Sequence, residues 1–155
     1  MTNKNNHLSD YQALAEFRYQ IRRYLRLSEE AAREAAIEPQ QHQLMLAVKG
    51  LPDGEEPRVS YLAERLQIHH HSAVELVDRM EKKGLIHRVR ADSDRREVHV
   101  QLTPRGNLVL AHLTKHMRDE LRSAAPTLVA TLRKLTVQAS QAAQRSSKAG
   151  KRGAA

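Results

Sequence analysis

The spacing of apolar residues changes from a helical to a strand period between residues 73 and 102, and this change restricts the fold more than any other feature of the chain. The first part holds an apolar stripe at the i, i+3, i+4, i+7 spacing of a half-buried helix, namely Ala73, Leu76, Val77 and Met80. Two runs rich in β-branched residues follow, 86–90 and 97–102, and predict antiparallel strands. Gly84 suits the left-handed position past the helix, with Leu85 folding back on Met80. The region therefore predicts a helix with a defined end and then a β-hairpin.

A second, shorter helix is predicted directly before this one. Ser60 is its expected cap, Val59 is expected to form a very short strand before it, and its inward residues are Leu62, Ala63 and Leu66. The turn between the two helices occupies residues 67–69. Helix, short turn, helix and hairpin, in this order, are the layout of a winged helix-turn-helix, whose second helix enters the major groove of DNA.

Longer helices flank this module. A capping box at Ser9-Asp10-Tyr11-Gln12 predicts the start of the first, Pro39 starts a second, and Thr103-Pro104 starts a helical region that Pro126 is expected to interrupt. These helices expose a greater apolar length than the small helix-turn-helix module can cover. We therefore expect them to pair with a second copy of the chain about a two-fold axis. The predicted fold is mostly α with a small β-hairpin wing (α+β), a winged helix-turn-helix with flanking dimerisation helices. Its single domain, 1–143, comprises the DNA-binding module 58–106 and dimerisation helices 9–38 and 104–143, followed by a disordered basic tail, 144–155.

Composition excludes several classes of protein. The chain has no cysteine, hence no disulfide framework, thiolate zinc site or thiol redox sensor. It shows no export signal and no membrane-spanning apolar run, so we expect a cytoplasmic protein. The net charge is +8, of which the tail 144–155 carries four and the module 58–106 three. This charge permits nucleic-acid binding by counterion release, and with one Phe and four Tyr for base stacking, duplex DNA is favoured over single strands.

Three segments of the module resemble one known family. The runs VSYLAERL, SAVELVDRMEKKGLI and DRREVHVQLTPRG are similar to those of the multiple antibiotic resistance regulator (MarR) family. The wing signature of that family is met by Asp94, Arg96, Leu102, Thr103 and Gly106. The resemblance implies a homodimeric transcription regulator that binds a pseudo-palindromic operator. It also implies that the protein is a repressor, released by a small phenolic or carboxylate ligand held between the dimerisation helices and the winged module.

The start of the second helix of the module holds the candidates for reading DNA sequence, because only the first turns of a recognition helix usually reach base edges. His and Ser donate to purines or phosphate, Val contacts a thymine methyl, and Glu accepts from a cytosine amino group. Phosphates otherwise repel a carboxylate, so Glu75 is either a specificity residue or, as we favour, an intrahelical partner of Arg79. The candidates here are His70, His71, Ser72, Val74, Glu75 and Arg79.

The predicted hairpin adds candidates for binding DNA. Arg95 suits the narrow, negative minor groove, whereas Asp94 and Arg96 are expected to form an orienting pair. Arg88 and Arg90 complete the set. Taken alone, the charged loop of this hairpin could equally be a solvated surface loop with no ligand. The position of the hairpin directly after two helices favours a DNA-binding wing.

A site for a small organic effector and, as the main alternative, a zinc site are each predicted from only a few residues. An anionic aromatic ligand would suit the side chains of Tyr19, Arg22, Arg23, Arg26 and His42, although the arginines also suit a dimer seam or solvent. His112 and His116 stand one helical turn apart and suggest a zinc-responsive regulator instead, but no third ligand is evident. We otherwise expect no metal and no cofactor.

Two further function classes are disfavoured. The sequence lacks a Gly-rich phosphate loop, a His-Glu-x-x-His motif and a nucleophile elbow, so we do not expect an enzyme. The wing arginines argue against a winged helix that binds only protein partners. The sequence therefore predicts a homodimeric regulator of transcription that binds double-stranded DNA sequence-specifically, a repressor released by a small aromatic or anionic ligand.

Overall fold

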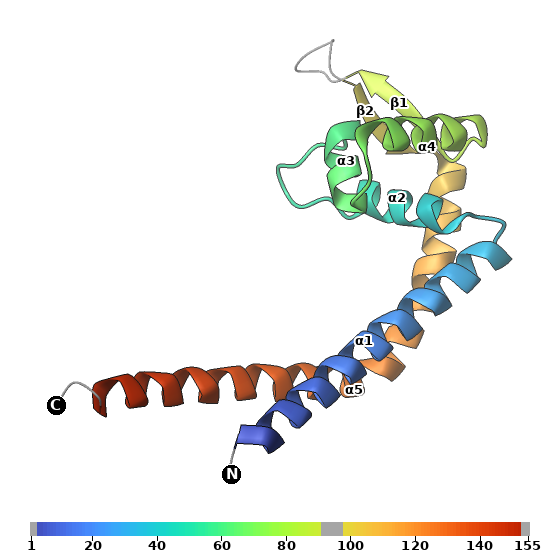
Figure 1. Cartoon of the computed structure of the whole chain (residues 1–155). Coiled ribbons are helices and arrows are strands. Elements are labelled where there is room, and N and C mark those ends of the chain that lie inside the picture. Colours follow the sequence, from blue (N-terminus) through green and yellow to red (C-terminus); the bar gives the residue numbers. More distant parts are fainter. Residues whose placement is uncertain (1–2, 91–97, 153–155) are drawn as a thin grey trace. The chain divides into compact units, whose positions relative to one another are not determined.

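The computed structural model describes the backbone of residues 3–90 and 98–152, and the side-chain environments of residues 10–90 and 98–136. Figure 1 shows helices and a two-stranded hairpin, which confirms the mostly helical fold with a hairpin wing. The elements are α1 (Asn3–Glu34), α2 (Pro39–Lys49), α3 (Val59–Leu66), α4 (His70–Lys82), β1 (Ile86–Arg90), β2 (Val98–Leu102) and α5 (Pro104–Arg152). They form two compact units: unit 1 is Met1–Leu27 with Arg118–Ala155, and unit 2 is Ser28–Met117.

Unit 2 is built around one apolar core. Every predicted inward residue of α4 is fully buried there, and so are Leu44 and Met45 of α2 and Leu62 of α3. Leu85, Ile86 and Val100 of the hairpin region close the same core. Since α4 touches α2, α3 and β1, this core fixes the helix that the sequence predicted to enter DNA.

Three helices of unit 2 end in the same backbone motif. After α4, Gly84 has a φ of 67°, the Leu85 amide donates to the Met80 carbonyl at 3.0 Å, and the Gly84 amide donates to that of Glu81 at 2.9 Å. This is the predicted Schellman motif. The α3 and α1 helices end alike, with Gln67 (φ 55°) and Ala36 (φ 57°) at the left-handed position. Neither residue is glycine, so these two motifs were not predictable from the sequence.

The hairpin and the start of α5 are tied to the end of α4. β1 pairs antiparallel with β2, with Ile86 opposite Leu102. The Thr103 hydroxyl caps α5 as predicted: it accepts from the Gly106 amide at 3.0 Å and donates to the Gly84 carbonyl at 2.8 Å. A Cβ atom on Gly106 would lie 2.0 Å from the carbonyl oxygen of Leu85, so only glycine permits this approach.

The start of α3 differs from the prediction by two residues. Val59 is the first residue of α3, not a strand, and the extended residue is Arg58, which forms an isolated bridge with His99. The amide of Val100 donates to the Pro57 carbonyl at 2.9 Å. This pairing with β2 places the extended segment before Val59, so Arg58 rather than Ser60 is the N-cap residue.

The two long helices differ from their predicted limits: α1 begins earlier than predicted and ends at Glu34, before residue 38, and α5 extends beyond residue 143. The capping box at Ser9 is wrong as a helix start, because α1 begins at Asn3 and ends at Glu34. α5 continues through Pro126, whose missing N–H removes only one hydrogen bond from a long helix. The tail predicted to be disordered from residue 144 is helical to Arg152, since Ala, Gln, Lys and Arg are good helix formers.

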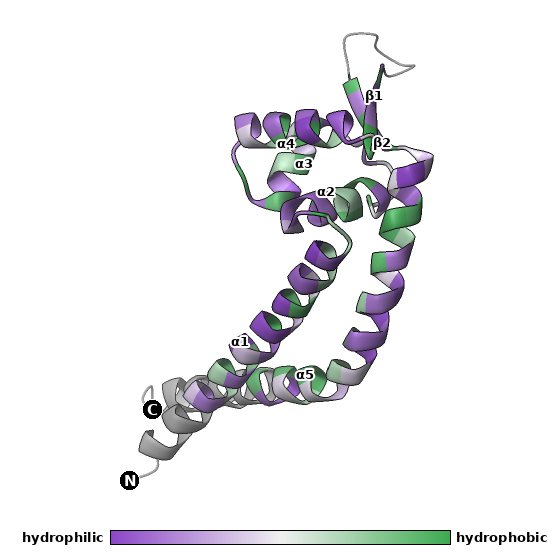
Figure 2. Cartoon of the chain, turned by 90° about the vertical axis from the view of Figure 1, so that its right-hand side faces the viewer, coloured by the Kyte–Doolittle hydropathy of each residue, from purple (hydrophilic) through white to green (hydrophobic). Residues whose placement is uncertain are grey.

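Unit 1 consists of amphipathic helical segments from α1 and α5. Figure 2 shows hydrophilic and hydrophobic bands along α1. Several large apolar side chains of this unit remain exposed, namely Tyr11, Leu14, Ile21, Leu25, Leu121, Val129 and Leu132. Within residues 3–90 and 98–152, none of the helices has the length and hydropathy that a membrane span requires.

Candidate nucleic-acid interface

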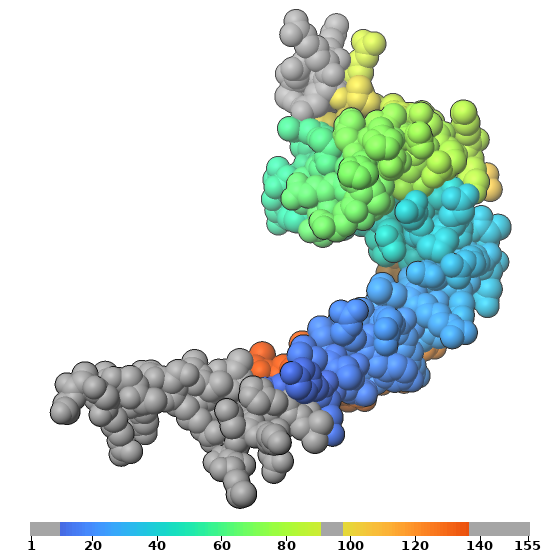
Figure 3. All heavy atoms as spheres, viewed as in Figure 1, coloured from blue at the N-terminus to red at the C-terminus, as the bar shows by residue number. Residues whose placement is uncertain are grey.

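The first turns of α4 present an exposed face opposite the core. Figure 3 shows atoms of α3 and α4, in green, at the surface of unit 2. His70, His71, Glu75 and Arg79 are exposed, whereas Ser72 and Val74 are half-buried. Within the described part of the chain, no ion pair joins Glu75 to Arg79, the partnership that we favoured from the sequence. The Glu75 carboxylate is therefore available to a ligand.

The N-terminal end of α4 is rich in imidazole groups. His69 is the N-cap residue, and its ring stacks on that of His71 with centroids 5.6 Å apart and planes 9° apart. No acidic residue lies in the first turn. This end of the helix, with its amide groups and positive dipole end, is thus not neutralised by a carboxylate of its own first turn.

The C-terminal end of α4 is held by ion pairs and hydrogen bonds. The Arg88 guanidinium on β1 contacts the carboxylates of Asp78 and Glu81 on α4, each at 2.5 Å, and the Arg88 amide donates to Glu81 at 2.9 Å. Lys83 donates to Gln41 of α2 at 3.2 Å, and Arg105 of α5 donates to the Lys83 carbonyl at 3.1 Å. Neighbouring elements therefore hold this end from three sides.

Arg88 was predicted to bind DNA, and the structure gives it other partners. Its side chain is 27 % exposed. Partial burial disfavours its charge, but the hydrogen bonds and attraction of Asp78 and Glu81 outweigh this effect and raise the pKa of Arg88 above its ordinary value. The guanidinium is thus engaged within the protein rather than directed to a ligand.

The remaining wing candidates divide into two groups. Arg90 is the last residue of β1 and is exposed. Asp94, Arg95 and Arg96 lie outside the described residues. The groove-binding role of Arg95 and the orienting pair of Asp94 with Arg96 therefore stay predictions.

The predicted effector residues are divided between the two units. Tyr19, Arg22, Arg23 and Arg26 are exposed on the part of α1 that belongs to unit 1. His42 is 2 % exposed in unit 2, where its Nδ1 lies 3.5 Å from the Ser28 hydroxyl, and burial lowers its pKa. A neutral, enclosed imidazole does not provide a surface contact for an anionic ligand.

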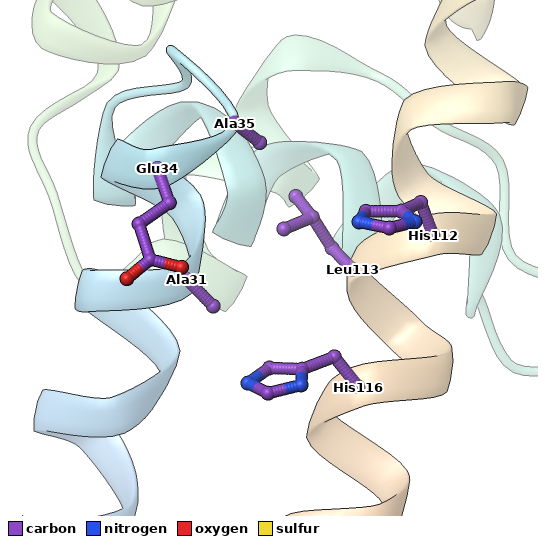
Figure 4. A pocket seen from close by; sticks show the side chains of 6 residues that line it. All are labelled: Ala31, Glu34, Ala35, His112, Leu113 and His116. Atoms are coloured by element: carbon purple, nitrogen blue, oxygen red, sulfur yellow. The ribbon is translucent and has the colours of Figure 1, made fainter.

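A cavity of about 210 Å³ lies elsewhere in unit 2. Figure 4 shows side chains of α1 and α5 directed into the space between them. The lining residues are Ala31, Glu34, Ala35, His112, Leu113 and His116. The sequence indicated the two histidines by their spacing, whereas Glu34 is far away in sequence and gave no signal. Within the described ranges, no three His, Cys, Asp or Glu residues are grouped closely enough to hold a metal ion.

Known proteins share this fold. Residues 37–97 match the model of the MarR family. A crystal structure of a MarR family transcription regulator matches with a TM-score of 0.69 at 19 % identity, over 97 % of this chain and 97 % of that one. The transcriptional repressor CouR bound to a 23-mer DNA duplex gives 0.56 at 26 % identity, over 77 % and 87 %. CouR from Rhodococcus jostii RHA1 bound to p-coumaroyl-CoA gives 0.56 at 18 % identity, over 63 % and 67 %. No curated protein matches the sequence.

These matches agree with the geometry of unit 2. The matched region, 37–97, contains α2, α3, α4 and β1, and includes the buried core of α4 and its exposed first turns. Residues 37–97 of this chain thus match the MarR family model, and the chain shares the fold of a solved MarR family transcription regulator.

Proposed function

We propose that this protein regulates transcription by binding duplex DNA, with the start of α4 in the major groove. One observation carries the proposal: the first turn of α4 holds no carboxylate and exposes His70 and His71, while the opposite face of the helix is fully buried in the core. A helix supported in this way presents His70, His71 and Glu75 to base edges at little entropic cost. The DNA-bound relative CouR supports the same role for this chain.

We also propose a homodimer on a pseudo-palindromic operator. The exposed apolar residues of unit 1 would be covered by the same residues of a second copy, as a two-fold interface requires. Two copies of α4 would then bind two half-sites. Repression is the mode we favour, and a cytoplasmic location stays a prediction.

DNA binding is tested by fluorescence anisotropy with the duplex upstream of the protein's own gene. We expect high affinity that falls with salt, since phosphate contacts release counterions. His71→Ala should weaken binding, whereas Gln43→Ala, on the exposed face of α2, serves as the matched control. Light scattering should give twice the mass of the chain. A monomer that ignores duplex DNA at low salt would overturn the proposal.

For the effector, the cavity lined by Glu34 and the two histidines replaces the site predicted on α1. Its apolar floor of Ala31, Ala35 and Leu113 and its volume suit a compound with a single ring. A carboxylate repels an anion but accepts a hydrogen bond, so we propose an uncharged phenolic ligand that donates to Glu34. CouR with its bound p-coumaroyl-CoA supports small-molecule control of this kind.

The ligand proposal is tested by thermal unfolding of the full chain. Phenol should raise the unfolding temperature more than benzoate does, and Leu113→Ala should alter this effect, while Glu34→Gln should reduce it. An equal rise with benzoate would show that Glu34 does not select the ligand. Zinc chloride in the same assay tests the metal alternative: a rise that His112→Ala and His116→Ala both remove would support zinc instead.

A further inference from the structure

Arg88 connects two elements that are separate in sequence: the helix that we propose to enter the major groove, and the hairpin that the sequence predicts to bind DNA as a wing. Its backbone lies on β1 of the hairpin, and its guanidinium lies against α4. One guanidinium nitrogen donates to Asp78 and another to Glu81, while the Arg88 amide donates to the second oxygen of the Glu81 carboxylate. One residue thus fastens the wing strand to the last turns of α4 through three hydrogen bonds.

The chemistry of this contact requires arginine. The planar guanidinium offers several N–H groups in a fixed fork and satisfies two carboxylates at once, whereas a lysine ammonium is a compact point charge. Asp78 and Glu81 stand three residues apart, hence on neighbouring positions of one helix face. Without Arg88, two half-exposed carboxylates would remain close together beside the DNA-binding surface.

We propose that Arg88 is a positioning residue, which sets the angle between wing and recognition helix so that both engage one duplex. It does not itself contact phosphate. The inference rests on the proposed function, because only a protein that binds DNA through α4 and the wing needs this alignment. Asp78 and Glu81, which the DNA would otherwise repel, act as partners of Arg88 in this role.

The change in DNA affinity on neutralising Asp78 and Glu81 distinguishes a positioning role of Arg88 from direct contact with phosphate. If Arg88 bound phosphate, the two carboxylates would compete for it, and Asp78→Asn with Glu81→Gln would strengthen DNA binding by freeing Arg88 and removing repulsion. If Arg88 positions the wing, the same double variant weakens operator binding although it makes the protein more positive. Lysine substitutes for arginine in a phosphate contact, but not in a fork between two carboxylates.

The experiment compares affinities of full-length variants for two duplexes, the upstream region of the gene and a scrambled sequence of equal length. We expect Arg88→Gln, Arg88→Lys and the double carboxylate variant each to weaken the specific complex about tenfold. Binding to the scrambled duplex should change less, because non-specific binding does not need the alignment. Arg33→Gln breaks the Arg33–Glu29 ion pair of α1 and is the matched control for lost charge.

Two measurements keep the result interpretable. Circular dichroism and urea unfolding verify that each variant is folded at the assay temperature, and hydrogen exchange of the Arg88 amide should accelerate in Glu81→Ala. Tighter DNA binding by the double carboxylate variant, or full retention of affinity by Arg88→Lys, would overturn the positioning role. Failure of the unaltered protein to bind either duplex would instead overturn the proposed function.

Discussion

The two ends of α4 differ in their surroundings. At the start, His70, His71 and Glu75 are exposed, and no side-chain hydrogen bond or ion pair holds them in the described part of the chain. At the end, Arg88, Lys83 and Arg105 join the helix to β1, α2 and α5. A helix that must read a ligand needs free side chains at one end and a rigid support at the other. The proposed DNA reading and the support of the fold therefore fall on different turns of one helix.

The largest expected effect comes from a change at the supported end. In Gly106→Ala the new Cβ would meet the Leu85 carbonyl oxygen, so α5 must move away from the residue that follows the α4 cap. We expect a loss of about 3 kcal/mol in the free energy of unfolding, as for severe overpacking. Urea unfolding measures this loss.

Gly84→Ala is the control for Gly106→Ala. Its Cβ would meet no atom within 4 Å, and only the positive φ of 67° opposes it, so we expect about 1 kcal/mol. A Gly106→Ala variant no less stable than Gly84→Ala would show that α5 does not need its close approach to Leu85.

The second prediction concerns the free end of α4. Glu75→Ala should leave the free energy of unfolding within about 0.5 kcal/mol of the original value, since the side chain is exposed and unpaired with Arg79. DNA binding should respond differently. If Glu75 reads a cytosine, the variant loses about 1 to 3 kcal/mol of discrimination at one base pair.

A panel of duplexes, each with one substituted base pair, measures that discrimination by anisotropy. Gln43→Ala, exposed on α2, should change neither stability nor base preference. Uniformly tighter binding of Glu75→Ala to every duplex would mean that Glu75 only repels phosphate. Glu75 would then not be a residue that reads base sequence at the start of α4.

The sequence predicted the parts of this comparison that depend on local pattern. Apolar spacing located the buried face of α4, and Gly84 marked its end because glycine is the residue that most readily adopts a positive φ. The exposed face of α4 followed from the buried one. These features need no knowledge of distant residues.

The supports at the other end were not predictable in the same way. Arg88 carries the same charge whether it meets phosphate or a carboxylate, and only the packing of β1 on α4 decides between them. Glu34 lines the same cavity as His112 and His116 because segments that are distant in sequence pack together. Left-handed caps at Ala36 and Gln67 lack the glycine that signals them.

The third prediction tests the support that α2 gives to α4. His42 is buried beside Gln41, which accepts from Lys83 at the end of α4. Because burial lowers the pKa of His42 in the folded protein, the unfolded chain binds the proton first, and stability falls as the pH drops below 6.5. Urea unfolding between about pH 7.5 and about pH 5 should show this loss.

His42→Gln is the control for the pH dependence, because glutamine has similar polarity and does not titrate. Its stability should change less over the same pH range than that of the unaltered protein. An identical decline in both proteins would assign the acid sensitivity to other groups and leave the support from α2 independent of His42.

The smallest effect is a gain in stability at the turn that leads into the free end. Gln67 adopts a φ of 55° between α3 and α4, a conformation that costs a side-chain-bearing residue about 1 kcal/mol and glycine much less. The side-chain Nε2 of Gln67 also donates to the Glu64 carbonyl at 2.9 Å, which offsets part of that cost. Gln67→Gly should therefore raise the free energy of unfolding by about 0.5 kcal/mol at most, and Ala36→Gly, with no such bond, by more. Because α4 keeps its supports at the other end, DNA affinity should stay unchanged in Gln67→Gly. A loss of affinity in this stabilised variant would show that the turn before His69 also positions the reading residues, and that the supported end of α4 is insufficient to hold them.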